Sequence, residues 1–186
     1  MSVGLWILIA VLVAIALAVI LLVNRMISLR NRSRNAFSDI DVQLKRRWDL
    51  VPALVETVKG YATHEQDTFV ATVKARDHAA AEQSVAGRGA AEGQLAGQVK
   101  NLFALAEAYP ELKANQQFLQ LQRDLVKIED TLQSARRYYN AVVRDYNSLI
   151  EKFPAVMLAG LFGHRPLEFF ELADTAERAA PKVNVQ

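Results

Sequence analysis

The chain has 186 residues, of which 22 are Lys or Arg and 20 are Asp or Glu, so its formal net charge at pH 7 is only +2. A charge this close to balance does not indicate a nucleic-acid-binding protein. The chain contains no cysteine, which excludes disulfides, thiolate metal sites, a cysteine nucleophile and redox chemistry on protein thiols.

The N-terminal region is apolar. No residue from Val3 to Val23 carries a charge, and a helix of this length reaches about 30 Å, the thickness of the hydrocarbon core of a bilayer. The segment is too long for the apolar core of a secretory signal, no basic residue precedes it, and no Ala-x-Ala-like cleavage site follows it. Residues 1–24 are therefore predicted to be a short tip and a retained transmembrane helix.

The juxtamembrane segment, residues 25–35, is basic. Its cationic residues are Arg25, Arg30, Arg32 and Arg34, which all precede the first acidic residue, Asp39. The positive-inside rule predicts that this flank and the following domain lie in the cytoplasm and that Met1 lies outside. These arginines are also candidate contacts for anionic lipid headgroups, and the alternative is that they only set the topology.

Small residues repeat within the apolar segment. Ala10, Ala14 and Ala18 are spaced by four and share one helix face, where small side chains allow another helix to approach closely. They are candidates for association of membrane helices and hence for a homo-oligomer. The alternative is chance, because alanine is common in such segments.

The remainder of the chain shows helical spacing of apolar residues and no strand-like alternation. The first seam continues from Phe37 to about residue 84, and Pro52 and Gly60 are weak points at which the helix is expected to kink, restart or turn. Residues 85–89 are glycine-rich and are predicted to form a mobile loop. A shorter helix follows at 94–108.

A longer seam runs from Phe118 to Phe153 with spacings that alternate between three and four, as in bundles and coiled coils, and Pro154 ends it. The predicted fold is all-α: an N-terminal transmembrane helix followed by an elongated antiparallel helical bundle over 36–153, with helices at 36–84, 94–108 and 112–153. If the first bundle helix is unbroken, Pro154 lies far from the membrane. A hairpin near Pro52 or Gly60 reverses that assignment.

The C-terminal part, 154–186, is predicted to be an apolar hairpin-like segment and a polar tail. Residues 155–170 are too short to span a bilayer and are expected to pack on the bundle end, on a partner or on the membrane surface. Tyr139 and Tyr146 fall on the long seam and are interpreted as core residues, with a polar stripe at a partner interface as the alternative.

The sequence offers no catalytic, cofactor or metal motif. Thr68 stands where an H-E-x-x-H site beginning at His64 would need its second histidine, and His78 is about 21 Å from His64 along a straight helix. His64, His78 and His164 are therefore interpreted as solvated residues. The carboxylates are interpreted as ordinary charged helix faces.

The most distinctive polar feature of the sequence is a basic cluster. Lys45, Arg46, Arg47 and Trp48 are candidate docking or register residues, and Arg47 falls on the apolar seam itself, where an unpaired charge is costly. Asp49, Glu56 or a carboxylate of another helix is expected to neutralise it. The cluster is either a docking patch for an acidic partner or phospholipid, or an internal ion pair that fixes helix register. In the second case, Arg47→Leu is expected to leave stability equal or higher.

The residues 36–47, 49–52 and 54–61, then 135–140 with Tyr146-Asn147, and 153–163 together resemble the LemA family over essentially the full chain. The resemblance implies a protein of the bacterial cytoplasmic (inner) membrane with one N-terminal membrane helix and a helical bundle. It does not supply an activity.

The interpretation that combines these features is a membrane-anchored helical scaffold or adaptor, without enzyme activity. We expect the lipid bilayer, further copies of the chain and other membrane proteins of the envelope as partners, and no nucleic acid. The alternative is a membrane-remodelling or lipid-binding bundle protein. An enzyme of unrecognised type is the third possibility.

Overall fold

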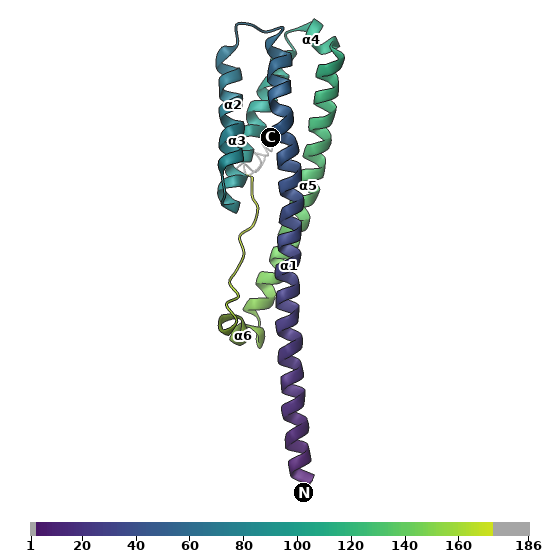
Figure 1. Cartoon of the computed structure of the whole chain (residues 1–186), viewed down its shortest axis with the longest axis vertical. Coiled ribbons are helices and arrows are strands. Elements are labelled where there is room, and N and C mark those ends of the chain that lie inside the picture. Colours follow the sequence, from purple (N-terminus) through teal and green to yellow (C-terminus); the bar gives the residue numbers. More distant parts are fainter. Residues whose placement is uncertain (1–2, 173–186) are drawn as a thin grey trace, which may run out of the picture. The chain divides into compact units, whose positions relative to one another are not determined.

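A computed structural model describes residues 3–172, and every helix or strand among them is an α-helix (Figure 1). The helices are α1 (Val3–Lys59), α2 (Gln66–Ala81), α3 (Val85–Ala106), α4 (Pro110–Ala114), α5 (Gln116–Glu151) and α6 (Ala155–Leu161). The predicted all-α class is confirmed. The predicted polar tail at 173–186 lies outside the described residues.

The chain forms two compact units, each made of two chain segments. Among the described residues, the anchor unit comprises 3–38 and 136–168, and the bundle unit comprises 39–135 and 169–172. Helices α1 and α5 each contribute residues to both units.

The anchor unit contains the apolar N-terminal half of α1. This is the helix that is long and apolar enough to cross a membrane, and its most apolar 18-residue window has a mean hydropathy of 3.3 and no buried portion. Beyond this window, a small core joins α1, α5 and α6. Its members are Met26, Tyr146, Ile150 and Ala159, with Val23, Leu29, Leu149, Leu158 and Leu167 packed around them.

Helix α6 therefore lies beside α1 at the end of the apolar segment (Figure 1). Ala155 and Ala159, four residues apart, are its buried positions. Pro154 precedes this contact, so it lies near the apolar segment rather than far from it. This is the arrangement predicted for a hairpin in the first bundle helix.

In the bundle unit, α1, α2, α3, α4 and α5 share one apolar core. The members that are fully buried include Val51, Leu54 and Val58 of α1, Leu95 and Leu102 of α3, and Leu112 of α4. The spacing of Val51, Leu54 and Val58 on α1 by three and four residues is what the apolar seam predicted.

The hairpin lies at Gly60. Helix α1 ends at Lys59, and the amides of Tyr61 and Ala62 donate to the carbonyl of Val58, which satisfies a carbonyl that the helix end would otherwise leave free. The predicted helix at 36–84 is thus two helices, α1 and α2, joined by a turn. Among the two weak points, Gly60 is the one that reverses the chain.

Pro52 does not break α1, because α2 compensates for its missing amide. A proline inside a helix removes the hydrogen bond to the carbonyl four residues earlier, here that of Trp48. Nε of Arg76 on α2 donates to this carbonyl at 3.2 Å. The side chain of a neighbouring helix thus replaces the lost backbone donor.

The predicted loop at 85–89 is wrong, since these residues form the first turns of α3. Ser84 caps the helix, because its Oγ accepts a hydrogen bond from the amide of Gly87 at 3.0 Å. Gly89 is buried against the backbone of Glu171, and a Cβ at this position would overlap the carbonyl oxygen of that residue. The cap and this close approach outweigh the low helix propensity of glycine.

We expect Arg76→Met to lower the free energy of unfolding by about 1 kcal/mol, because the Trp48 carbonyl then loses its donor. In a Pro52→Ala background the restored amide can donate to that carbonyl, so the same substitution should cost less. Lys74→Met, an exposed position on the same helix, is the matched control. Thermal unfolding of the full chain in detergent, followed by circular dichroism, measures all four variants. Equal losses in the two backgrounds would contradict the compensation.

Candidate functional site

The bundle unit buries a cation, Arg47, which is 4% exposed. Its Nη1 lies 3.4 Å from Oε2 of Glu92 on α3 and 3.2 Å from Oε2 of Glu129 on α5. The Glu92 side chain is fully buried, whereas that of Glu129 is 42% exposed. The carboxylates that neutralise Arg47 thus come from two other helices, which is one of the predicted alternatives.

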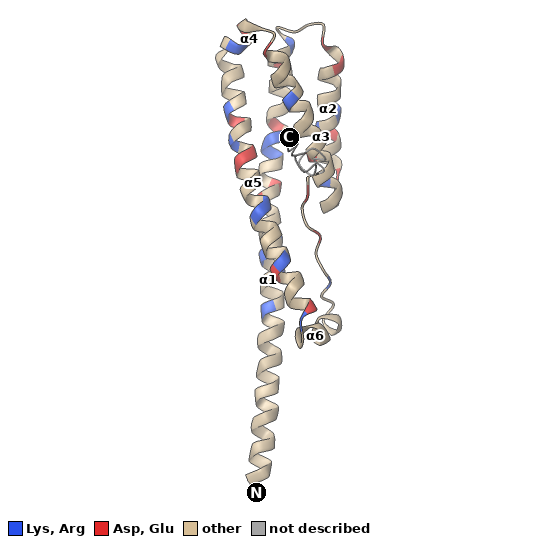
Figure 2. Ribbon diagram, turned by 180° about the vertical axis from the view of Figure 1, so that it is seen from behind, with Lys and Arg blue, Asp and Glu red and all other residues tan. Residues whose placement is uncertain are grey.

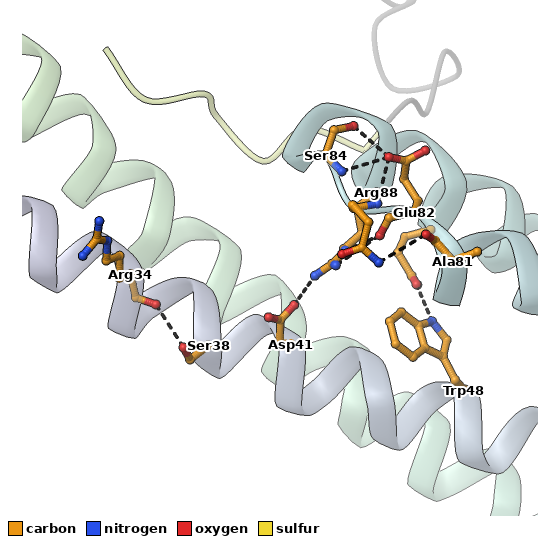
Figure 3. Close-up of polar contacts among 10 residues, drawn as sticks. Arg34, Ser38, Asp41, Trp48, Ala81, Glu82, Ser84 and Arg88 are labelled. Carbon is orange, nitrogen blue, oxygen red and sulfur yellow. Dashed lines mark hydrogen bonds and ion pairs between the residues drawn. The ribbon is translucent and has the colours of Figure 1, made fainter. Parts of the chain in front are cut away.

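Trp48 completes this cluster. Its ring Nε1 donates a hydrogen bond of 2.6 Å to Oε1 of Glu92, shown by the dashed line from the ring in Figure 3. Burial raises the pKa of the Glu92 carboxyl above its usual value, against the opposing effects of the Arg47 guanidinium and the Trp48 hydrogen bond. Both Glu92 oxygens are occupied by donors from α1, so the cluster fixes how α1 and α3 align.

A second polar contact joins α1 to the α2–α3 turn. Arg88 forms an ion pair with Asp41, and its Nε and Nη2 donate to the carbonyl of Glu82 at 3.2 and 3.1 Å (Figure 3). The Glu82 carboxylate accepts hydrogen bonds from the backbone amide and the hydroxyl of Ser84. The hydrogen bond from the amide is the main reason that the pKa of Glu82 is lowered. This contact holds the α2–α3 turn against α1.

The structure divides the candidate docking cluster. Arg47 and Trp48 point to Glu92, whereas Lys45 and Arg46 are exposed. Arg46 lines a groove of about 400 Å³ between α1 and α5. The other lining residues are Gln43, Asp49, Leu50, Asp124, Lys127, Ile128 and Thr131. Only Lys45 and Arg46 are therefore placed where a partner could reach them.

Glu92 was not predicted as a functional residue, because it lies between the predicted loop at 85–89 and the predicted helix at 94–108. It lies three residues before Leu95, and Val99, Leu102 and Ala106 continue the same face. Extending that spacing by one step toward the N-terminus places an acidic residue on a buried helix face. This position was the available signal for the partner of Arg47.

The juxtamembrane arginines also have different environments within the anchor unit. Arg25 and Arg32 line a cleft of about 750 Å³. Arg34 lines a separate hollow with Phe37 and Tyr139, and Arg30 is half-buried. The four arginines therefore do not form one continuous surface.

Tyrosine and asparagine side chains tie the segment after α6 to α5. The hydroxyl of Tyr146 lies 3.0 Å from Nδ1 of His164, and that of Tyr139 donates to the carbonyl of Glu168 at 2.9 Å. Asn147 bonds both backbone groups of Leu167 at 2.9 Å. Tyr139 and Tyr146 are therefore core residues with polar partners, as predicted.

His164 corrects the prediction that all three histidines are solvated. It is 8% exposed, whereas His64 and His78 are exposed. Burial, and secondarily the positive charge of Arg30, lowers the pKa of His164. Within residues 3–172, no three His, Asp or Glu side chains gather closely enough to hold a metal ion.

In the apolar part of α1, Ala10, Ala14 and Ala18 are all exposed. Their side chains are available on the helix surface, as an association face requires.

The sequence profile of the LemA family matches residues 36–185, which include both the Arg47–Glu92 cluster and the segment tied to α5. The chain belongs to the LemA family. The family resemblance predicted from residues 36–163 is therefore confirmed.

Three relatives of this LemA-family chain carry the name of a magnetosome protein. Magnetosome protein MamQ of Magnetospirillum gryphiswaldense is 26% identical over 189 aligned positions, which cover 86% of this chain and 68% of the relative. Magnetosome proteins MamQ 1 and MamQ 2 of Paramagnetospirillum magneticum are each 31% identical over 81 residues, 44% of this chain and 30% of each relative. The matched part spans less than a third of the length of these two relatives.

The buried partner reverses the expectation that Arg47→Leu leaves stability equal or higher. We expect Arg47→Leu or Glu92→Gln alone to lower the free energy of unfolding by about 3–5 kcal/mol, because each leaves a buried charge without its main partner. Glu92→Gln keeps an acceptor for Trp48. The double variant should recover most of the loss, since no unpaired charge remains.

The control for this cycle is the exposed pair of Lys113 and Glu107, whose side chains are 49% and 69% exposed. Glu107→Gln should change the free energy of unfolding by less than about 1 kcal/mol. Chemical unfolding in detergent measures the cycle. Additive losses in the double variant would show that Arg47 and Glu92 do not act as a pair.

Proposed function

We propose that the protein is a membrane-anchored helical scaffold or adaptor of a bacterial envelope, without catalytic activity of its own. Copies of the chain associate, and the bundle unit presents a docking surface to other membrane proteins. The observation that carries this proposal is that one helix, α1, begins as an exposed apolar segment and continues into the core of the bundle unit. The bilayer is the environment that would cover the exposed part.

The use of the interior charges supports a structural role. Arg47 and Trp48 of α1 both bond to Glu92 of α3 and hold these helices together, and Tyr146 of α5 bonds to His164 in the segment after α6. Three relatives named as magnetosome proteins support a role in a bacterial subcellular assembly. A lipid-binding or membrane-remodelling function is the second candidate, and the arginine-lined cleft of the anchor unit favours it.

The proposed topology places the N-terminus outside and the chain after the apolar segment in the cytoplasm, because the basic residues lie on the C-terminal flank of that segment. The absence of native cysteine allows single-cysteine labelling. In spheroplasts, a membrane-impermeant maleimide should label Ser2→Cys at once and label Lys74→Cys only after the membrane is permeabilised. The opposite pattern would place the bundle unit in the periplasm.

The scaffold proposal predicts a discrete assembly heavier than the 20.7 kDa chain when the protein is extracted gently from its native membrane. Mass measurement of the intact assembly, with identification of co-purified proteins, provides the test. A lone monomer without partners would overturn the proposal.

The same measurement locates the contact. Ala14→Ile adds bulk to the face that carries the repeated alanines and should reduce assembly if the membrane helices associate there. Ala16→Ile adds the same bulk two residues away, on another face, and is the matched control. Assembly that resists both substitutions would place the contact in the folded units.

A further inference from the structure

The cleft of about 750 Å³ in the anchor unit is lined by cationic side chains from two helices. Arg25 and Arg32 come from α1, and Arg144 and Lys152 come from α5. All four are exposed, and none forms an ion pair with another of the residues described, 3–172. Of the described lining residues, Asp145 is the one carboxylate, so it balances only one of the four positive charges and the cleft stays net positive. Such a cleft attracts an anion.

The cleft begins where the apolar segment ends. Along the axis of α1, Arg25 and Arg32 lie about 3 Å and about 14 Å beyond Val23, at a rise of 1.5 Å per residue. The headgroup region of each leaflet is about 5–8 Å thick. Long basic side chains can reach lipid phosphates from just outside that region. Figure 2 shows this change along α1, from a segment without charged residues to one with basic residues.

Helix α6 exposes an apolar surface at the same level of α1. It packs on the small core next to Val23 and Met26, with Ala155 and Ala159 buried. Its exposed apolar residues include Met157 at 69% and Leu161 at 78%, and Phe153, just before the helix, is 80% exposed. Met157 and Leu161 are four residues apart and share one side of α6.

This apolar surface lies at the level where the exposed apolar surface of α1 ends, because Ala159 of α6 and Val23 of α1 belong to the same small core. A bilayer that covers residues 3–23 therefore extends to α6. Insertion of large apolar side chains at the boundary between headgroups and acyl chains removes them from water. The bilayer thus accounts for both the exposed side chains and the excess positive charge.

We propose that the cleft between α1 and α5 binds the phosphate of an anionic phospholipid, while Phe153, Met157 and Leu161 insert into the same leaflet beside α1. This inference rests on the proposed membrane anchorage. It assigns two residues of α5, Arg144 and Lys152, to lipid binding, which the arginine run of α1 alone does not indicate. The α6 surface holds the cleft at the depth of the phosphates.

Lipid retention by the full-length protein tests the cleft. We expect native mass spectrometry in detergent to show that the wild type retains added phosphatidylglycerol and not phosphatidylcholine. Arg144→Gln/Lys152→Gln should weaken retention of phosphatidylglycerol at least tenfold. Arg123→Gln/Lys127→Gln removes the same charge from the same helix outside the cleft and should retain the lipid.

Equal retention by the cleft variant and the wild type, or equal retention of the two lipids, would overturn the proposal. Inorganic phosphate added as a competitor distinguishes the two sources of phosphate. Displacement of the lipid by millimolar phosphate would assign the cleft to the free anion instead.

Membrane extraction with carbonate tests the anchorage independently of the cleft. The cleft variant keeps its apolar segment and should therefore stay in the membrane fraction. If the wild type is extracted, the anchorage itself fails.

Insertion of α6 is tested in nanodiscs that contain phosphatidylglycerol. A fluorophore on Leu161→Cys should be quenched by lipids with a nitroxide near the headgroup, whereas the same fluorophore on Lys74→Cys of α2 should not. Equal quenching at the two positions would show that α6 does not enter the leaflet.

Discussion

A guanidinium that is buried among apolar helices must be met by a carboxylate, and the bundle unit is organised around this requirement. Arg47 of α1 is neutralised by Glu92 of α3 and Glu129 of α5, and Trp48 holds the second oxygen of Glu92. Apolar packing alone tolerates small shifts of one helix along another. A buried ion pair does not, because displacement leaves a charge unpaired in a medium of low dielectric constant.

The anchor unit differs from the bundle unit, because it contains an irregular segment that packs against helices. The chain after α6 has backbone groups without helical partners, and side chains of α5 satisfy several of them. Asn147 bonds both backbone groups of Leu167, and Tyr139 bonds the carbonyl of Glu168. These polar residues lie on or next to the apolar seam of α5, so one face supplies both packing and hydrogen bonds.

The sequence predicted the features that depend on local spacing. Apolar periodicity located α5, and the all-α class followed from the absence of strand-like alternation. Contacts between distant positions were not predictable in this way. Arg76 supports Pro52 from another helix, Ser84 starts α3 where glycines suggested a loop, and Glu92 meets Arg47 only after three helices pack. The contacts of Arg76 and Glu92 are tertiary, whereas the Ser84 cap is a local contact with Gly87 that outweighs the low helix propensity of the glycines.

The division of the chain has a consequence for biosynthesis. Each unit combines two separate segments, and residues 136–168 complete the anchor unit that begins with α1. A ribosome delivers the apolar segment first and its packing partners last. Met26 therefore has no packing partners from α5 until Tyr146 and Ile150 are synthesised, after most of the bundle unit. A nascent chain interrupted before residue 136 would reach the membrane with this apolar surface uncovered, which makes such fragments natural substrates for quality-control proteases.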